Sequence, residues 1–374
     1  MTSPGRAGQA TRRARRPAGP APVELGLIEG FFGPVWSWEE RGAVMRLLAG
    51  HGYRFHLYAP KGDPYLRRRW AEPIPAPELA RMAAFADDCR RHGVRFGVGL
   101  TVLEANQGLE PDRLAALAAK VEQLNRIPVD DLAILFDDVR GDTPEAAARQ
   151  ADIVHRCAAV TRAGRLVMCP TYYSTDAILD RVFGPRPATY LADLGRLLDP
   201  AVGVFWTGEE VCAREFGLAH LRDVGAILRR RPTLWDNYPV NDGPTMSRFL
   251  HLRGFTGRPA SLAGEIAAHA INPALQPILG CVPALTLAMS YREGTGYRYG
   301  DATRAACSTV LGEPLAELVL ADLRLLEDAG LERLGAQRER LLARYRAIDH
   351  AAAREIVGWL EGRYAVSAEM VQTQ

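Results

Sequence analysis

The sequence predicts an α/β fold, a (β/α)8 barrel followed by a helical region. From residue 24 onward, short apolar runs alternate with stretches of helical periodicity, which is typical of βα units around a parallel sheet. The runs also recur at nearly equal intervals. The chain of 374 residues is long enough for one large barrel with an appendage, or for two ordinary domains.

Eight apolar runs are the predicted strands. They cover residues 25–31, 53–59, 94–100, 132–136, 166–169, 202–206, 233–235 and 266–271. The predicted helices between them include residues 40–50, 76–92, 113–124, 144–161 and 211–230. In the second of these helices, Leu79, Met82, Phe85 and Cys89 fall on one face, which is the pattern of a helix packed on a sheet.

The spacing of the runs favours closure into a barrel. Landmarks at the ends of the runs, from Gly30 to Asn272, follow one another every 30 to 39 residues. Eight such periods end near residue 290 and match a (β/α)8 barrel, which typically has about 250 residues. An open, doubly wound sheet would be favoured by a glycine-rich phosphate fingerprint after the first strand. Phe31 and Phe32 instead fill the gap between Gly30 and Gly33, so we predict the barrel.

Three regions are expected along the chain. Residues 1–23 hold five arginines and no acid, and we expect a disordered basic tail there. Paired arginines in this tail resemble a twin-arginine export signal, but no apolar stretch follows them. The barrel is expected over residues 24–290. Residues 291–374 are expected to be helical, with 313–346 and 350–363 as an antiparallel helical pair packed on the barrel.

Composition narrows the class of protein. The chain has 46 basic and 44 acidic residues and a net charge of +2, which gives no case for a nucleic-acid or membrane-surface partner. None of the six cysteines forms a Cys-x-x-Cys pair, so we expect free thiols and a cytoplasmic protein. The eight histidines show no metal-ligand spacing, and no apolar run is long enough to span a membrane. We therefore expect neither a metal nor another cofactor.

Polar side chains at the ends of the predicted strands form a candidate site, because reactive groups of a βα barrel gather there. Carboxylates and amides dominate the set and predict a ligand with many hydroxyl groups. Its members are Glu29, Gly30, Lys61, Asp63, Asp137, Asp138, Tyr172, Tyr173, Trp206, Thr207, Asp236, Asn237, Asn241, Asp242 and Asn272. Flat apolar surfaces for a sugar ring are expected from Trp206, Trp235, Tyr172 and Tyr173.

The sharpest local signal is the segment LAILFDDV at residues 132–139. Two adjacent carboxylates, Asp137 and Asp138, end an otherwise apolar strand. Like charges this close cannot both ionise freely, so one of the two groups should hold its proton more tightly. Such a pair can supply one general acid and one carboxylate. A metal-binding pair, or the N-cap of a helix that starts after Asp142 and Thr143, remains an alternative interpretation.

Eight short blocks carry a family resemblance when they are taken in order. They are GLIEGFFGPVW (26–36), YAPK (58–61), LFDD (135–138), CPTYY (169–173), FWTG (205–208), LWDN (234–237), ND (241–242) and INP (271–273). This series resembles the catalytic barrel of glycoside hydrolase family 84, the β-N-acetylglucosaminidases that include protein O-GlcNAcases. The resemblance runs from about Gly26 to Pro273 and implies a TIM barrel, in agreement with the spacing argument.

The resemblance implies a retaining, substrate-assisted mechanism, in which the 2-acetamido oxygen of the substrate forms an oxazoline and no enzyme nucleophile is needed. Asp137 would polarise the acetamido N–H. Asp138 would protonate the leaving oxygen and then deprotonate water. Tyr173 would steady the acetamido group and the oxazoline.

The resemblance also assigns six further residues to binding the sugar. Asn237 would support the acetamido group and Trp235 would form its wall. Asp242 would accept hydrogen bonds from the O4 and O6 hydroxyls, and Asn272 from O6. The Gly30 carbonyl and the Lys61 ammonium would contact the 3-hydroxyl side. From the residues alone, Trp235 also fits a core position, Asn272 a turn before Pro273, and Lys61 a surface charge.

Three positions depart from the family pattern. Residues 100–108 read LTVLEANQG where the family often has Ser-Pro-Gly-Leu, Phe32 replaces a common tyrosine, and Gly62 replaces an acid. We expect all three to border the pocket and to affect the preference for the leaving group, or aglycone. The expected partner is a glycoconjugate that contains N-acetylglucosamine. The alternatives are a hydrolase of another N-acylhexosamine conjugate, an endo-acting hexosaminidase, and a sugar-binding barrel without activity.

Overall fold

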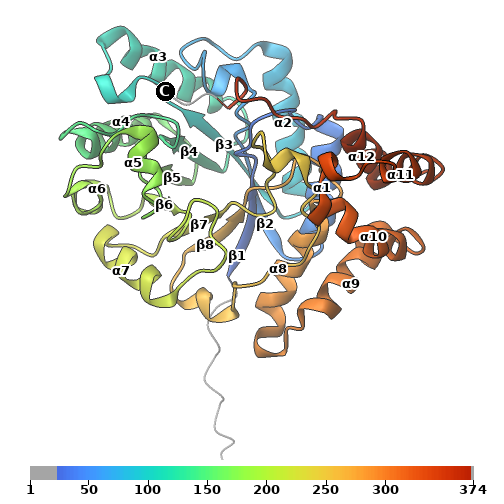
Figure 1. Cartoon of the computed structure of the whole chain (residues 1–374). Coiled ribbons are helices and arrows are strands. Elements are labelled where there is room, and N and C mark those ends of the chain that lie inside the picture. The colour runs from blue at the N-terminus through green and yellow to red at the C-terminus, as the bar shows by residue number, and fades with distance from the viewer. Residues whose placement is uncertain (1–22, 372–374) are drawn as a thin grey trace, which may run out of the picture.

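The computed structural model describes residues 23–371, and the predicted basic tail lies outside this range except for Val23. Eight parallel strands close into a barrel in the order of the sequence (Figure 1), which confirms the predicted (β/α)8 fold. The strands are β1 (Glu24–Ile28), β2 (Tyr53–Tyr58), β3 (Arg95–Thr101), β4 (Asp131–Leu135), β5 (Arg165–Cys169), β6 (Gly203–Trp206), β7 (Thr233–Asp236) and β8 (Ala268–Ile271). Each predicted apolar run contains or overlaps one of them.

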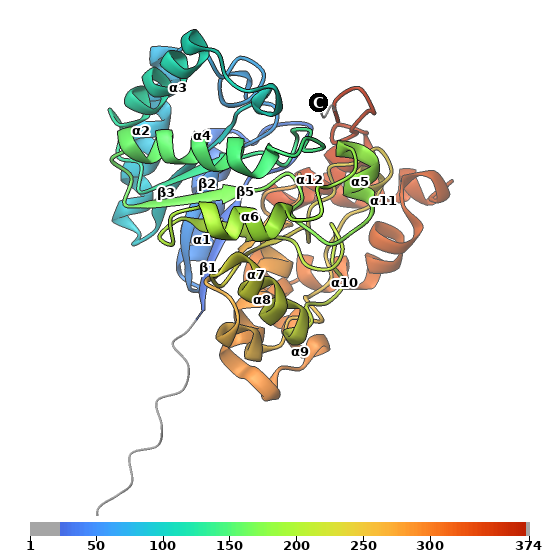
Figure 2. The same ribbon diagram turned by 90° about the vertical axis from the view of Figure 1, so that its left-hand side faces the viewer.

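Helices cover the outside of the barrel between the strands. They are α1 (Trp38–Ala49), α2 (Ala76–Arg91), α3 (Pro111–Leu124), α4 (Ala146–Val160), α5 (Ile178–Phe183), α6 (Tyr190–Leu197), α7 (Leu218–Leu228) and α8 (Cys281–Glu293). Figure 2 shows α4 and α6 side by side on one flank. Short 3-10 helices lie in the loops at η1 (Pro64–Leu66), η2 (Ala105–Gln107), η3 (Met246–Arg248), η4 (Ala260–Gly264) and η5 (Gly294–Gly296).

Two details differ from the predicted helices. The helix predicted over 211–230 begins only at Leu218, because the preceding residues form a loop that ends at the N-cap Gly217. Helices α5 and α6 between β5 and β6 were not predicted. The start of α1 is fixed by a reciprocal capping box between Ser37 and Glu40, which satisfies two backbone N–H groups of the first turn.

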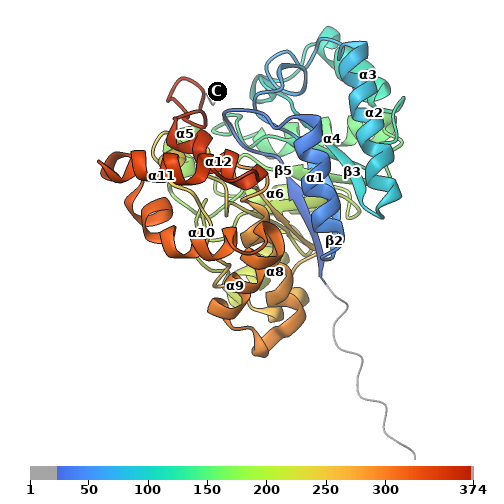
Figure 3. The same cartoon turned by 90° about the vertical axis from the view of Figure 1, so that its right-hand side faces the viewer.

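The region after α8 is helical but more broken than predicted. It contains α9 (Tyr299–Leu311), α10 (Leu315–Leu323), the π-helical turn η6 (Arg324–Ala329), the 3-10 turn η7 (Leu331–Arg333), α11 (Gln337–Arg346) and α12 (Ala351–Leu360). A single helix over 313–346 was therefore wrong. Gly330 lies at φ 71° between the two turns, a conformation that favours glycine and ends a right-handed helix. Figure 3 shows α9 to α12 gathered beside α8 on one side of the barrel.

The barrel interior is a packed core, not a channel. Inward side chains such as Ile28, Phe55, Leu135 and Phe205 fill it, as is usual for this fold. Trp235 belongs to the same cluster and reaches the carboxyl end of the strands. A site at that end therefore rests on a rigid floor. In the described part of the chain, no helix is both long and apolar enough to cross a bilayer.

Candidate active site

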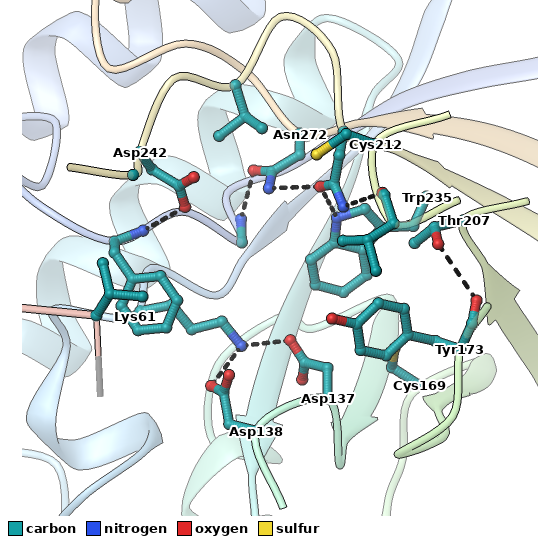
Figure 4. Close-up of a pocket in the computed structure, with 17 residues that line it drawn as sticks. Lys61, Asp137, Asp138, Cys169, Tyr173, Thr207, Cys212, Trp235, Asp242 and Asn272 are labelled. Carbon is teal, nitrogen blue, oxygen red and sulfur yellow. Dashed lines mark hydrogen bonds and ion pairs between the residues drawn. The ribbon is translucent and has the colours of Figure 1, made fainter. Parts of the chain in front are cut away.

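A pocket opens at the carboxyl end of the strands (Figure 4). Its volume is about 170 Å³, which suits a single sugar ring, because pockets for drug-sized molecules hold about 300–1,000 Å³. The structure brings to this pocket all nine residues to which the family resemblance gives a role, from the ends of six strands. They are Gly30, Lys61, Asp137, Asp138, Tyr173, Trp235, Asn237, Asp242 and Asn272.

Asp137 and Asp138 follow β4 and share one lysine. The Nζ atom of Lys61 lies 2.5 Å from Asp137 Oδ2 and 2.9 Å from Asp138 Oδ2 (Figure 4). Arg67 Nε donates to the same oxygen of Asp138 at 2.9 Å. All four residues are buried. Two carboxylates and two cations therefore form one compact cluster, in which opposite charges offset the cost of burial.

The two carboxylates differ in their affinity for a proton. Desolvation raises the pKa of Asp137, and the nearby charge of Asp138 adds to this effect although Lys61 opposes it. Desolvation also acts on Asp138, but attraction to Lys61 and Arg67 outweighs it and lowers the pKa. Asp137 Oδ1 is buried and has no hydrogen-bond partner within residues 23–371. A proton, or an N–H group of a ligand, would satisfy that oxygen.

A chain of amide hydrogen bonds organises another side of the pocket. Asn237 Oδ1 accepts from Trp235 Nε1 and from Asn272 Nδ2, both at 3.0 Å. Asn272 Oδ1 in turn accepts from the backbone N–H of Gly30 at 3.1 Å. Asn237 Nδ2 donates to the Val211 carbonyl at 2.9 Å (Figure 4). These bonds hold the indole of Trp235 in one orientation. A Cβ atom on Gly30 would lie only 2.1 Å from Trp235 Cζ2, so this position requires glycine.

Asp242 stands apart from the acid pair. Its Oδ2 accepts from the Phe32 N–H at 2.9 Å (Figure 4). Desolvation raises the pKa of Asp242 to about 6. The group is therefore mainly ionised at neutral pH and can accept hydrogen bonds from ligand hydroxyls.

Three further side chains that line the pocket keep their protons at neutral pH. Burial and the charge of Asp137 raise the pKa of Tyr173 well above its usual value. Burial does the same for the Cys169 thiol. Partial desolvation and the Asp242 carboxylate raise the pKa of Cys212 to about 11. The Tyr173 hydroxyl can thus act as a hydrogen-bond donor in the pocket.

Comparison with known proteins agrees with this geometry. A family model described as beta-N-acetylglucosaminidase matches residues 25–324. The chain belongs to this family. The match confirms the family resemblance expected from the eight sequence blocks.

Curated relatives and a solved structure are similar to this chain, in agreement with the family match. The chain is 27% identical over 282 residues to Protein O-GlcNAcase of Mus musculus, and equally to that of Rattus norvegicus. Each match covers 71% of this chain, which spans only 30% of the length of these relatives. A solved O-GlcNAc hydrolase mutant of Thermobaculum terrenum superposes with a TM-score of 0.74 at 27% identity, covering 91% of this chain and 81% of that one.

Several strand-end residues of this β-N-acetylglucosaminidase family member do not reach the pocket. Glu29 is fully buried and accepts from Arg41 and His56 outside the barrel interior. Asp236 is likewise held by a buried ion pair with Arg258. Both acids therefore join the barrel to its surrounding loops and helices, and the expectation that they face a ligand was wrong.

Asp63 and Asn241 also have structural partners. Asp63 accepts from the Tyr58 hydroxyl and from the Tyr65 N–H, both at 2.9 Å. Asn241 Oδ1 accepts from the Leu275 N–H at 2.9 Å. These contacts shape the loops after β2, β7 and β8 and leave neither residue in the pocket lining.

Two of the four predicted stacking surfaces were wrong. Tyr172 is fully buried, and its hydroxyl donates to the Gly184 carbonyl at 2.7 Å. Trp206 is also fully buried, and its Nε1 donates to His220 at 3.0 Å. Tyr173 and Trp235 do line the pocket.

The alternative interpretations of the acid pair gain no support. Helix α4 begins at Ala146 after Glu145, so neither Asp137 nor Asp138 caps it. The space between the two carboxylates is occupied by the Lys61 ammonium, where a metal ion would otherwise bind. Across residues 23–371 there is no group of three or more His, Cys, Asp or Glu side chains that could hold a metal ion.

Of the three departures from the family pattern, only one borders the pocket. Phe32 lines the pocket, as expected, but residues 100–108 and Gly62 do not. The loop after β3 is tied to the loop after β2, because its Leu103 carbonyl accepts from Trp70 Nε1 at 3.3 Å. At Gly62, a Cβ would meet the side chain of Val35 instead of the pocket.

Two residues of the site could not be found from sequence. Arg67 binds Asp138, but it is one of three consecutive arginines and nothing distinguishes it from Arg68 or Arg69. Val371 lines the pocket from the far end of the chain, about 100 residues beyond the last barrel motif. Only the folded structure places it at the barrel mouth.

Proposed function

We propose that this chain is a retaining β-N-acetylglucosaminidase that removes terminal β-linked N-acetylglucosamine from a glycoconjugate. The observation that carries the proposal is the pair Asp137 and Asp138, joined by Lys61 on the floor of a pocket for one sugar ring. Membership of the family and the names of its relatives support the same reaction.

The closeness of the two acids favours a substrate-assisted route. Retaining enzymes that use a carboxylate nucleophile place their two carboxyl groups about 5–5.5 Å apart, across the scissile bond. Here consecutive residues after β4 supply both acids, and both contact the same Nζ atom, which is not the arrangement of two carboxylates from opposite sides of the bond. The nucleophile proposed is therefore the acetamido oxygen of the substrate, whose attack is intramolecular and needs only orientation.

The proposed reaction has two steps. In the first, the acetamido oxygen bonds to C1, the bond from C1 to the leaving oxygen breaks, and Asp138 gives its proton to that oxygen. Asp137 accepts the acetamido N–H and stabilises the positive charge of the oxazoline. In the second step, the water oxygen bonds to C1 and Asp138 takes a proton from that water, while the bond from C1 to the acetamido oxygen breaks and the acetamido group is restored.

Asp138 must carry a proton when the bond breaks, although Lys61 and Arg67 lower its pKa in the sugar-free structure. The two acids titrate as a coupled pair. Lys61 is the neighbour that both share, and a sugar 3-hydroxyl that binds Lys61 weakens its hold on Asp138. We therefore propose that substrate binding raises the proton affinity of Asp138.

The remaining residues are proposed to hold the sugar. Trp235 forms the wall of the acetamido pocket and Asn237 supports it, with Tyr173 donating to the acetamido oxygen. Asp242 accepts from O4 and O6, and Asn272 binds O6. The Gly30 carbonyl contacts the 3-hydroxyl side together with Lys61. The volume of about 170 Å³ favours terminal over internal sugars.

The cytoplasm is the proposed compartment. All six cysteines are free, and five of them are buried, as is usual for proteins of a reducing environment.

Hydrolysis of aryl β-N-acetylglucosaminides tests the proposal. Wild type is compared with Asp137→Asn and Asp138→Asn on a good and a poor leaving group, and the anomer first released is identified by NMR. We expect retention, and a loss in Asp138→Asn that deepens with the poorer leaving group. Asp142→Asn is a matched control, because Asp142 follows the same strand but pairs with Arg140 outside the pocket. A folded wild type that binds N-acetylglucosamine without turnover would refute the proposed activity.

A further inference from the structure

The chain after α12 turns back toward the carboxyl end of the barrel (Figures 1 and 3). Ser247 holds both α12 and this following segment, with one hydrogen bond to each. The Ser247 carbonyl accepts from Trp359 Nε1, and its hydroxyl accepts from the Val366 N–H, both at 3.2 Å. Ser247 lies in the loop after β7, five residues beyond Asp242. The segment is thus tied to a loop that carries a site residue.

A second loop of the site meets the same segment. Val366 is only 5% exposed and packs beside Gly33 in the loop after β1. A Cβ atom on Gly33 would lie 2.9 Å from Val366 Cγ2, so the Val366 side chain packs directly on the backbone of Gly33. Gly33 directly follows Phe32, which lines the pocket.

Helix α12 itself is anchored to the loop after β8. Both carboxylate oxygens of Glu355 accept backbone N–H groups, from Ile278 at 2.8 Å and from Leu279 at 2.9 Å. The loops after β1, β7 and β8 carry Gly30, Asp242 and Asn272. One C-terminal element therefore contacts three of the loops that build the pocket.

The segment that packs against the loop after β1 also reaches the pocket. Val371 and Phe32 both line the pocket. The guanidinium of Arg67 lies 5.4 Å from the centre of the Phe32 ring, and Arg67 binds Asp138. The leaving oxygen of a substrate must lie next to its acid, so the aglycone leaves the pocket past these side chains.

We propose that the segment 364–371, ending at Val371, is the wall of the aglycone side and limits the bulk that the enzyme accepts next to the glycosidic oxygen. The inference rests on the proposed function, because it needs Asp138 to face the leaving group. Phe32 and Val371 line the pocket, and Val35, in the same loop as Phe32, is 41% exposed. An apolar group close to the glycosidic oxygen, such as an aryl ring, fits this surface better than a charged one.

Paired substrates test the wall. Phenyl and 2-naphthyl β-N-acetylglucosaminides have leaving groups of similar acidity and different size. Relative to wild type, Val371→Trp should lower kcat/KM for the naphthyl substrate about tenfold more than for the phenyl substrate, since pocket fit of this kind is worth about 10- to 200-fold. Val371→Gly should shift the ratio the other way. Met370→Trp is the matched control, because Met370 is exposed and does not line the pocket.

A binding experiment separates the failure of this inference from the failure of the proposed function. The dissociation constants of free N-acetylglucosamine and of the phenyl and naphthyl thioglycosides, which are not cleaved, are measured by calorimetry. Val371→Trp should weaken the naphthyl thioglycoside selectively and leave the free sugar unchanged. If wild type shows no turnover, these constants still test the wall. An equal effect on all three ligands, or unchanged ratios in both Val371 variants, would overturn it.

Discussion

Removal of the shared lysine should destabilise the protein in a pH-dependent way. In Lys61→Met, two buried carboxylates lose the ammonium that both contact. At the observed 2.9 Å to Asp138, attraction between unit charges is about 6 kcal/mol at an effective dielectric of 20. The variant no longer has the desolvation cost of burying the ammonium, which offsets part of the lost attraction. Removing one partner of a buried pair typically costs about 3–5 kcal/mol. We expect a loss of about 3 kcal/mol at pH 7.

The loss should shrink as the pH falls. Without Lys61, burial and mutual repulsion raise the pKa of the acids in the folded state above the unfolded values. The folded variant then binds more protons than the unfolded chain, and its stability falls as pH rises. Urea unfolding at pH 5 and pH 7 should therefore show the larger difference from wild type at pH 7.

The second lysine of the chain provides the control. Lys120 is buried and donates to the carbonyls of Tyr65 and Glu72, and it lies outside the pocket. Desolvation lowers the pKa of Lys120 to about 8, so it stays charged between pH 5 and pH 7. Lys120→Met should destabilise by a similar amount at both pH values. A loss in Lys61→Met below about 1 kcal/mol, or one that is equal at pH 5 and pH 7, would refute the reasoning.

Three further outcomes are expected. Gly30→Ala should lower kcat/KM about 100-fold, because the new Cβ displaces the Trp235 indole by about 1 Å. Gly264 has open space around it, so the control Gly264→Ala should match wild type. Substantial activity in Gly30→Ala would contradict the packing argument. KM should rise as the pH falls through about 6, where Asp242 becomes protonated, and Asp242→Asn should abolish this dependence in a pH series of initial rates. N-Ethylmaleimide should inactivate the enzyme slowly at pH 7 and faster at higher pH, because the exposed Cys212 has a pKa of about 11 and only its thiolate reacts. The variant Cys212→Ser should resist this inactivation. Inactivation of that variant at the wild-type rate would exclude Cys212 as the target.

Much of the fold could be predicted from local pattern. The strands are short and apolar on both faces, and their spacing repeats, so eight runs were enough to indicate closure. The same topology predicts that strand ends gather at one mouth of the barrel, which is how residues as distant as Gly30 and Asn272 were placed in one site.

The errors at the site arise from the alternation of side chains along a strand. Neighbouring residues point to opposite faces, so one of each strand-end pair faces the barrel axis and the other faces the helices. Phe205 and Trp235 point inward, while Trp206 and Asp236 point outward and are buried in contacts there. Both residues of such pairs are polar or aromatic. The apolar runs are too short to show which residue of each pair faces the barrel axis.

Contacts between distant parts of the chain set the second limit. Arg67 was missed because its role depends on Asp138, 71 residues away. The break between α10 and α11 was missed because helix-forming residues surround Gly330 and Gly335, the two glycines that adopt positive φ there.

The hydrogen bond from Gly30 to Asn272 has a consequence for folding. It spans 242 positions of the chain and crosses the seam where β1 pairs with β8, the contact that turns an open sheet into a ring. Contacts this remote in sequence form slowly, because the whole intervening loop must be ordered first. A sugar that binds Asn272 would hold the seam shut. At one hundred times its dissociation constant, it would add about 2.7 kcal/mol to the stability of the closed ring, so a substrate analogue should protect newly made protein from heat and proteases.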